Sequence, residues 1–297
     1  MWPELFSDYT FRLVVGGSAL IGGVSGALGC FAYLRKQSLV GDVVSHASLL
    51  GIVGAFCLSY LIAGVGNKSL LVLIPGAIFI GVLALLLTKL ITQTTRIKED
   101  AGLGLILAIF FGTGLTLLKW IQGKNSPIQG HAGLEDYLFG MAAAMTLDDL
   151  WMILILGGSA MLLLTLFWSR LKVLTFDAEY ARSLGLPVHG LELLILCLMV
   201  VGIVIGLQIV GVILMTSMLI APASAARQWT RHLNAMVCLA GLIGGCGAGL
   251  GAALSAIIDR MPTGPVIIII LTSFFLLSLF FSPERGLLIR KKSNVVY

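Results

Sequence analysis

The sequence predicts an all-α protein, a polytopic membrane helical bundle of about nine transmembrane helices. Of its 297 residues, 58% are hydrophobic and only 11% are charged, and the mean hydropathy is +1.04. Soluble domains carry about 25% charged residues, so a soluble fold could not hide this much apolar surface. The apolar residues also form continuous runs without alternation, which indicates membrane helices and not the strands of a barrel.

Eight apolar runs are long enough to cross a bilayer. They cover residues 11–34, 43–63, 71–91, 100–121, 148–168, 191–225, 235–258 and 264–281. The run 191–225 would measure roughly 50 Å as one helix, against a hydrocarbon core of about 30 Å. We therefore predict two helices there, joined by a tight turn near Gln208, which makes nine in all. Residues 1–297 are expected to form one transmembrane domain.

The basic residues gather on one side of this predicted topology. Fourteen of the 19 Lys and Arg residues fall on that side: Arg35, Lys36, Lys89, Arg96, Lys98, Arg170, Lys172, Arg182, Arg227, Arg231, Arg285, Arg290, Lys291 and Lys292. The positive-inside rule assigns that side to the cytoplasm. We therefore expect Met1 outside and Tyr297 in the cytoplasm.

Two further features concern packing. The 36 glycines include runs such as 22–26 and 244–249, which place small residues at helical spacing. They predict close helix–helix contact in the membrane. A shorter apolar stretch, 137–145, lies in the outer connection before residue 148. It is too short to span and is expected to form a re-entrant or interfacial helix, with Gly140 allowing close packing.

Several function classes are excluded by what the sequence lacks. It has no G-x-x-x-x-G-K-[ST] motif, so it does not bind ATP by that route, and no H-E-x-x-H or G-x-S-x-G motif. We therefore predict that the chain is not an enzyme. The net charge of +5 says little about nucleic acid, because in a membrane protein the position of the basic residues matters more than their sum. Membrane lipid is the expected surrounding, with no nucleic-acid partner.

The most informative polar residues predicted to lie in the membrane are Asp42 and His46, at the start of the helix that contains the apolar run 43–63. They are four residues apart, so they share one face of a helix. An ionisable residue in a membrane helix costs about 2.5–3.5 kcal/mol on insertion scales and marks a functional-site candidate. Carboxylate oxygen suits manganese, and imidazole suits zinc and related ions. Two alternatives remain open: an internal salt bridge, or a helix-start Asp that caps backbone amides.

A second candidate is the connection 175–187, which is predicted to be cytoplasmic. It reads as a short amphipathic helix closed by Gly185 and Pro187. Leu184 follows Tyr180 by four residues, which places an aromatic and an aliphatic side chain on one face. Such a helix can dock into a groove on a partner protein, and the alternative is an ordinary surface loop.

Several segments resemble the metal-ion branch of bacterial ABC importer permeases, which serves manganese, zinc and iron. They are 41–47 (GDVVSHA), 96–100 (RIKED), 137–140 (YLFG), 176–185 (FDAEYARSLG), 206–211 (GLQIVG) and 219–223 (LIAPA). The resemblance runs along nearly the whole chain in the same order. It implies a fold like a shortened permease of the vitamin B12 and siderophore type, located in the bacterial cytoplasmic membrane.

The resemblance also implies partners and residue roles. Such permeases work in pairs, as a homodimer or with a related paralogue, together with two cytoplasmic ATPase subunits and an extracytoplasmic metal-binding protein. The connection near residue 180 corresponds to the coupling helix that meets the ATPase. By this resemblance the coupling residues are Phe176, Asp177, Glu179, Tyr180, Arg182, Leu184 and Gly185. Asp42 and His46 correspond to the acidic and histidine positions of the translocation path.

We therefore predict the permease subunit of an importer for divalent transition-metal ions, most readily manganese or zinc. No tightly bound cofactor is expected, because the metal ion is the cargo. Two copies about a two-fold axis would bring two Asp and two His side chains together in a site weak enough to release the ion. The main alternative is a permease for a siderophore or cobalamin-type chelate, whose wider path needs fewer ionic groups.

Overall fold

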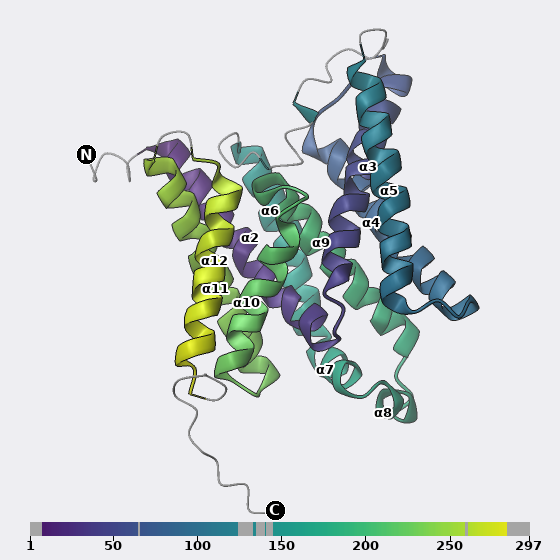
Figure 1. Ribbon diagram of the computed structural model, residues 1–297, viewed down its shortest axis with the longest axis vertical. Coiled ribbons are helices and arrows are strands. Elements are labelled where there is room, and N and C mark those ends of the chain that lie inside the picture. Colours follow the sequence, from purple (N-terminus) through teal and green to yellow (C-terminus); the bar gives the residue numbers. More distant parts are fainter. Residues whose placement is uncertain are drawn as a thin grey trace, which may run out of the picture.

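The computed structural model describes residues 8–64, 66–123, 133–134, 140, 145–258 and 261–283. Within these ranges the chain forms helices and no strands. The helices are α2 (Tyr9–Leu34), α3 (Leu39–Ala63), α4 (Leu70–Thr94), α5 (Glu99–Gln122), α6 (Leu147–Leu166), α7 (Trp168–Phe176), α8 (Ala178–Ser183), α9 (Val188–Val210), α10 (Met215–Trp229), α11 (Leu233–Ile257) and α12 (Thr263–Phe281). Figure 1 shows them as one elongated array of roughly parallel and antiparallel helices.

The membrane helices agree closely with the predicted apolar runs. Among the described residues, eight helices are long and apolar enough to cross a membrane: α2 to α6, α9, α11 and α12. The all-α, polytopic fold predicted from composition is therefore confirmed. The short helix α7 was not predicted, because the apolar run 148–168 ends at its first residue, Trp168, and the basic Arg170 and Lys172 follow.

The long run 191–225 divides into two helices, as its length predicted. The break follows Val210 and not Gln208, because Gly211 adopts a φ of +82°, a left-handed conformation that glycine tolerates. The second helix, α10, has 15 residues and measures about 22 Å, which is short of a full membrane span. The nine predicted helices thus correspond to eight full-length helices and the short α10.

The described chain begins and ends at opposite ends of the bundle. In Figure 1, α2 starts at the upper end, whereas α12 finishes at the lower end, where α7 and α8 also lie. The nine helices α2 to α6 and α9 to α12 run alternately in opposite directions, which accounts for this arrangement. The predicted coupling segment therefore lies at the same end of the bundle as the C-terminal end of α12.

Small residues hold the helices close, as their spacing predicted. A methyl group at Gly22 of α2 would overlap the Gly244 carbonyl of α11, and one at Gly51 of α3 would overlap the Gly76 carbonyl of α4. These contacts build two groups, α2 with α10, α11 and α12, and α3 with α4 and α5. Helix α9 contacts α2, α3 and α4 and lies between the groups in Figure 1.

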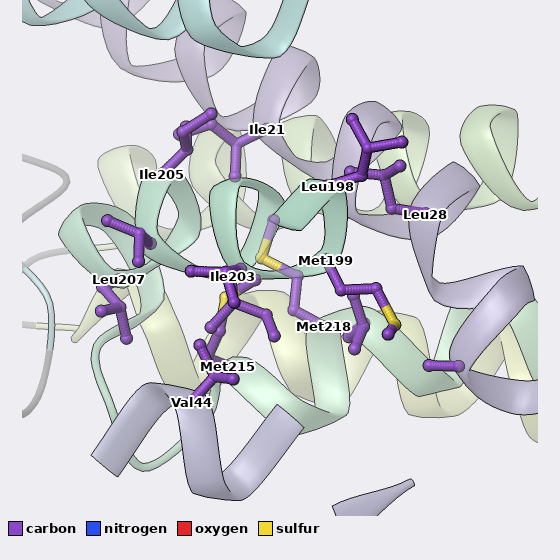
Figure 2. Packing of buried hydrophobic residues seen from close by; sticks show 14 of the residues in the cluster. Ile21, Leu28, Val44, Leu198, Met199, Ile203, Ile205, Leu207, Met215 and Met218 are labelled. Atoms are coloured by element: carbon purple, nitrogen blue, oxygen red, sulfur yellow. The ribbon is translucent and has the colours of Figure 1, made fainter. Parts of the chain in front are cut away.

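The buried core lies where these groups meet. Figure 2 shows Ile203 of α9, Met215 and Met218 of α10, and Val44 of α3 gathered in one apolar cluster. All four are fully or almost fully buried. Because Val44 is buried in this cluster, the first turns of α3 pack against α9 and α10.

The predicted re-entrant segment 137–145 lies outside the described residues, except for Gly140 and Met145. Gly140 has a φ of +83°, and a Cβ there would overlap the carbonyl oxygen of Ile209 near the end of α9. Met145 is buried, and its sulfur would meet a Cβ added at Gly17 of α2. Close packing at Gly140 is therefore confirmed.

Candidate functional site

Asp42 lies in the first turn of α3, beside the start of α10. The hydroxyl of Thr216, the second residue of α10, donates a hydrogen bond to Oδ1 of Asp42. Gly41 allows this approach, because a Cβ there would already lie 3.3 Å from the Thr216 methyl carbon. The chain break after Val210 sets where α10 begins. It therefore also sets which side chain reaches the carboxylate.

His46 lies one turn further along α3, and its ring is held on two sides. Its Nδ1 is 2.9 Å from the carbonyl oxygen of Asp42. A carbonyl can only accept, so this contact is a hydrogen bond when Nδ1 carries the proton, and Nε2 then keeps its lone pair. The ring also meets Phe111 of α5 edge to face, with ring centroids 4.6 Å apart. This is the tautomer that a metal-binding imidazole needs, with its other nitrogen fixed by a carbonyl.

The contacts of Asp42 bear on the alternatives that the sequence left open. The ion pairs found among the described residues do not join Asp42 to His46. The Asp42 carboxylate accepts the hydrogen bond of the Thr216 hydroxyl, and the N-cap residue of α3, Ser38, makes no side-chain cap hydrogen bond. Neither the internal salt bridge nor the helix cap therefore accounts for Asp42. Asp42, His46 and Thr216 all remain partly exposed in the single chain.

A single chain does not complete a metal site within the residues that the structure describes. Within the described ranges, no group of three or more His, Cys, Asp or Glu side chains is placed to hold a metal ion. Protein-bound zinc takes about four ligands, and harder divalent ions take six or more. If Asp42 and His46 contact an ion, as the sequence predicts, the remaining ligands must come from water or from a second chain.

Thr216 was not identified from the sequence, because a threonine in an apolar stretch carries no signal of its own. We expect Thr216→Val to lower metal uptake roughly tenfold, since outer-shell partners of a metal ligand are worth about 10–100-fold. Valine keeps the shape and removes the donor to Asp42. Uptake should be measured per molecule in the membrane. Thr216→Ser keeps the hydroxyl and should remain near wild type, and equal loss in both variants would contradict this role.

The second candidate site is the segment around α8, at the lower end of the bundle in Figure 1. The side chains of Phe176, Tyr180 and Leu184 are 57%, 54% and 52% exposed, although all three are large and apolar. The other predicted coupling residues, Asp177, Glu179, Arg182 and Gly185, are exposed as well. An exposed apolar cluster rimmed by charges is typical of a protein-binding surface.

The local sequence explains how α8 forms. The Asp177 carboxylate accepts a hydrogen bond of 2.8 Å from the Tyr180 amide and so caps the helix start. Gly185 has a φ of +72°, and the Leu186 amide donates to the Ala181 carbonyl at 3.1 Å, which closes the helix end. The predicted closure at Gly185 is therefore confirmed. One boundary was wrong: residues 175 and 176 end α7 and do not open the connection.

Helix α7 anchors this segment to the membrane helices. Leu171 and Leu174 are buried, and Trp168 meets Phe31 of α2 edge to face at 6.2 Å between ring centroids. The buried Ala181 fastens α8 itself. The exposed apolar side chains of Phe176, Tyr180 and Leu184 therefore lie on a segment that is packed against the membrane helices.

Known proteins resemble this chain along nearly its whole length. Residues 7–282 match the model of the ABC 3 transport family. The chain is 43% identical over 97% of its length to the manganese transport system membrane protein MntC of Bacillus subtilis, and it spans 64% of that relative's length. It is 42% identical over 96% of its length to the zinc transport system membrane protein TroC of Treponema pallidum, covering 93% of it.

A solved structure agrees with the fold. PsaBC from Streptococcus pneumoniae, in complex with Fab, matches with a TM-score of 0.82 and 29% identity, covering 96% of this chain and 98% of that one. A metal-chelate type ABC transporter in an inward-facing conformation matches at a TM-score of 0.66 and 17% identity, which supports the fold alone. The chain therefore belongs to the ABC 3 transport family and is a membrane permease of that family.

Proposed function

We propose that this permease carries divalent manganese or zinc ions into the cell and that Asp42 and His46 contact the ion. One observation carries the proposal. Nδ1 of His46 lies 2.9 Å from the Asp42 carbonyl oxygen, and with the proton on Nδ1 this arrangement leaves Nε2 for an ion, one helical turn from the Asp42 carboxylate. The names of the two relatives described above, which specify manganese and zinc, support the same cargo.

The two groups have complementary tasks. The Asp42 carboxylate offsets the charge of an ion that has lost part of its water shell, and His46 supplies a neutral nitrogen. Because a single chain holds only two such ligands, we propose that a second permease subunit contributes the same pair across a two-fold axis. Two carboxylates, two imidazoles and remaining water would bind the ion and still release it.

The remaining subunits follow from the family. We propose that each of two ATPase subunits docks on the α8 surface of one permease and that an extracytoplasmic protein delivers the ion. ATP hydrolysis then belongs to the partner, and the permease is a single domain over residues 1–297. The exposed Phe176, Tyr180 and Leu184 support the docking role.

Orientation can be argued from two independent features. The basic residues favour a cytoplasmic C-terminus, and α8 lies at the same end of the bundle as the end of α12. If an ATPase docks on α8, that end is cytoplasmic. We expect reporter fusions to place Met1 outside and Tyr297 in the cytoplasm, and fusions that report both termini on one side would contradict nine crossings.

The test of the function is reconstitution of the permease with its ATPase and capture protein in vesicles. We expect ATP-dependent accumulation of manganese or zinc, each assayed as the free ion. Accumulation of a preformed ferric siderophore or of cobalamin without free-ion uptake would favour the chelate alternative. Relatives named for chelated iron, at 32% and 34% identity, make this a necessary comparison.

A further inference from the structure

A second polar cluster lies away from the candidate ion path, at the end of the bundle that carries α8. Oε2 of Glu192 in α9 is 2.6 Å from Nζ of Lys89 in α4. Oε1 of the same carboxylate is 3.8 Å from Nη2 of Arg35, the residue that ends α2. The three side chains are only 18%, 31% and 19% exposed. The carboxylate therefore joins three helices in a partly dehydrated setting.

This cluster adjoins both sites described above along the chain. Glu192 is in the second turn of α9, the helix that follows α8 after a connection of four residues, 184–187. Arg35 opens the tight turn that leads into α3 and hence to Asp42. Lys36 in that turn has a φ of +57°, a backbone conformation that residues other than glycine rarely adopt. Contacts with neighbouring helices must therefore stabilise the turn.

The same turn makes a second polar contact with another helix and contains polar atoms without a hydrogen-bond partner. Nε2 of Gln37 donates to Oε1 of Glu99 at the start of α5, at 2.8 Å. Nη1 of Arg35 and Oε1 of Gln37 are buried without a hydrogen-bond partner, and both side chains line a polar cavity of about 220 Å³ together with Lys89 and Glu192. Lys89 is thus the close partner of the Glu192 carboxylate. Arg35 has a hydrogen-bond donor without a partner and borders a cavity into which its side chain can shift.

We propose that Glu192 is a positioning residue that couples α8 to the ion site by changing its partner between Lys89 and Arg35. The proposal depends on the proposed roles of α8 and Asp42. When the ATPase displaces α8, the start of α9 moves with it and carries Glu192 toward Arg35. The turn before α3 then shifts, and with it the Asp42 carboxylate.

The exchange is expected to be between two discrete arrangements. A charge in a poorly hydrated place is costly when it is left unpaired, so the Glu192 carboxylate keeps one of the two cations as its close partner throughout. Packed helices also change between alternative contacts more readily than they deform continuously. The spare Nη1 of Arg35 supplies the second hydrogen bond that a paired guanidinium would make in the other arrangement.

The test uses the complete transporter in vesicles and measures ATP hydrolysed per ion taken up. We expect Glu192→Gln to raise this ratio about tenfold, with the amount of inserted protein near wild type. Asp148→Asn removes an exposed carboxylate from α6 and should leave the ratio unchanged. If Glu192→Gln lowers hydrolysis and uptake in equal proportion, the residue is merely structural and the proposal is overturned.

Partner exchange itself predicts effects of opposite sign. Lys89→Met favours the Arg35 pair, whereas Arg35→Met favours the Lys89 pair, so basal ATP hydrolysis should rise in one variant and fall in the other. A change in the same direction in both would overturn the exchange. This readout needs no metal. Failure of the proposed cargo would instead appear as absent manganese and zinc uptake in the wild-type transporter.

Discussion

Asp42→Asn is expected to reduce manganese or zinc uptake about 100-fold or more per inserted molecule, because losing even an outer-shell partner costs about 10–100-fold. The substitution keeps the size of the side chain and can still accept from Thr216, so the packing of α3 on α10 should survive. What it removes is the negative charge that offsets dehydration of the ion. Metal accumulation should be normalised to the amount of folded permease in the membrane.

His46→Ala should cause a loss of similar size for a different reason. It removes the free Nε2, while the Asp42 carbonyl that held Nδ1 stays in the helix. His232→Ala is the matched control, since His232 is exposed at the start of α11 and makes no side-chain cap. If uptake per molecule is preserved in both Asp42→Asn and His46→Ala, the ion path is lined by other groups.

Leu184→Asp is expected to separate the permease from its ATPase. Leu184 is 52% exposed and, with Tyr180, forms the apolar surface of α8. A charge there should therefore weaken binding of the ATPase without lowering the stability of the permease. Central apolar contacts of an interface are worth about 2 kcal/mol or more, which corresponds to roughly 30-fold in affinity. Co-purification of the ATPase and ATP-driven uptake should both fall, with membrane insertion unchanged.

The conservative variant Leu184→Met tests whether charge is the cause. Methionine keeps an apolar side chain of similar volume and should preserve the complex. Normal coupled uptake in Leu184→Asp would exclude α8 as the docking surface. Loss of folded protein in Leu184→Asp alone would show that Leu184 supports the permease itself, which its exposure makes unexpected.

The helices could be predicted from the sequence because the bilayer imposes a simple rule. A segment without water must satisfy its backbone internally, so each apolar run of about 20 residues becomes a helix. The run 191–225 showed by length alone that it must divide. Its break lies after Val210 because the conformation of Gly211 decides the position, and hydropathy does not report a single φ value.

Asp42 and His46 stood out for the same reason. Ionisable groups are costly in an apolar run, so the few that occur there carry information. The coupling segment was predicted partly from the spacing of Tyr180 and Leu184 and partly from its resemblance to a family. The start of the coupling segment was not predicted correctly, because the chain continues from α6 into a second helix, α7, after a break at Phe167 only.

The sequence by itself thus determined that the chain is a membrane helical bundle and which residues are candidates for the ion path. Only the tertiary structure decided what each candidate contacts. Thr216 lies 174 residues from Asp42, and Glu192 lies 103 residues from Lys89, so no local pattern can pair them. Such pairs depend on how helices pack side by side, and that packing is set by the whole bundle and its small residues, not by any one segment.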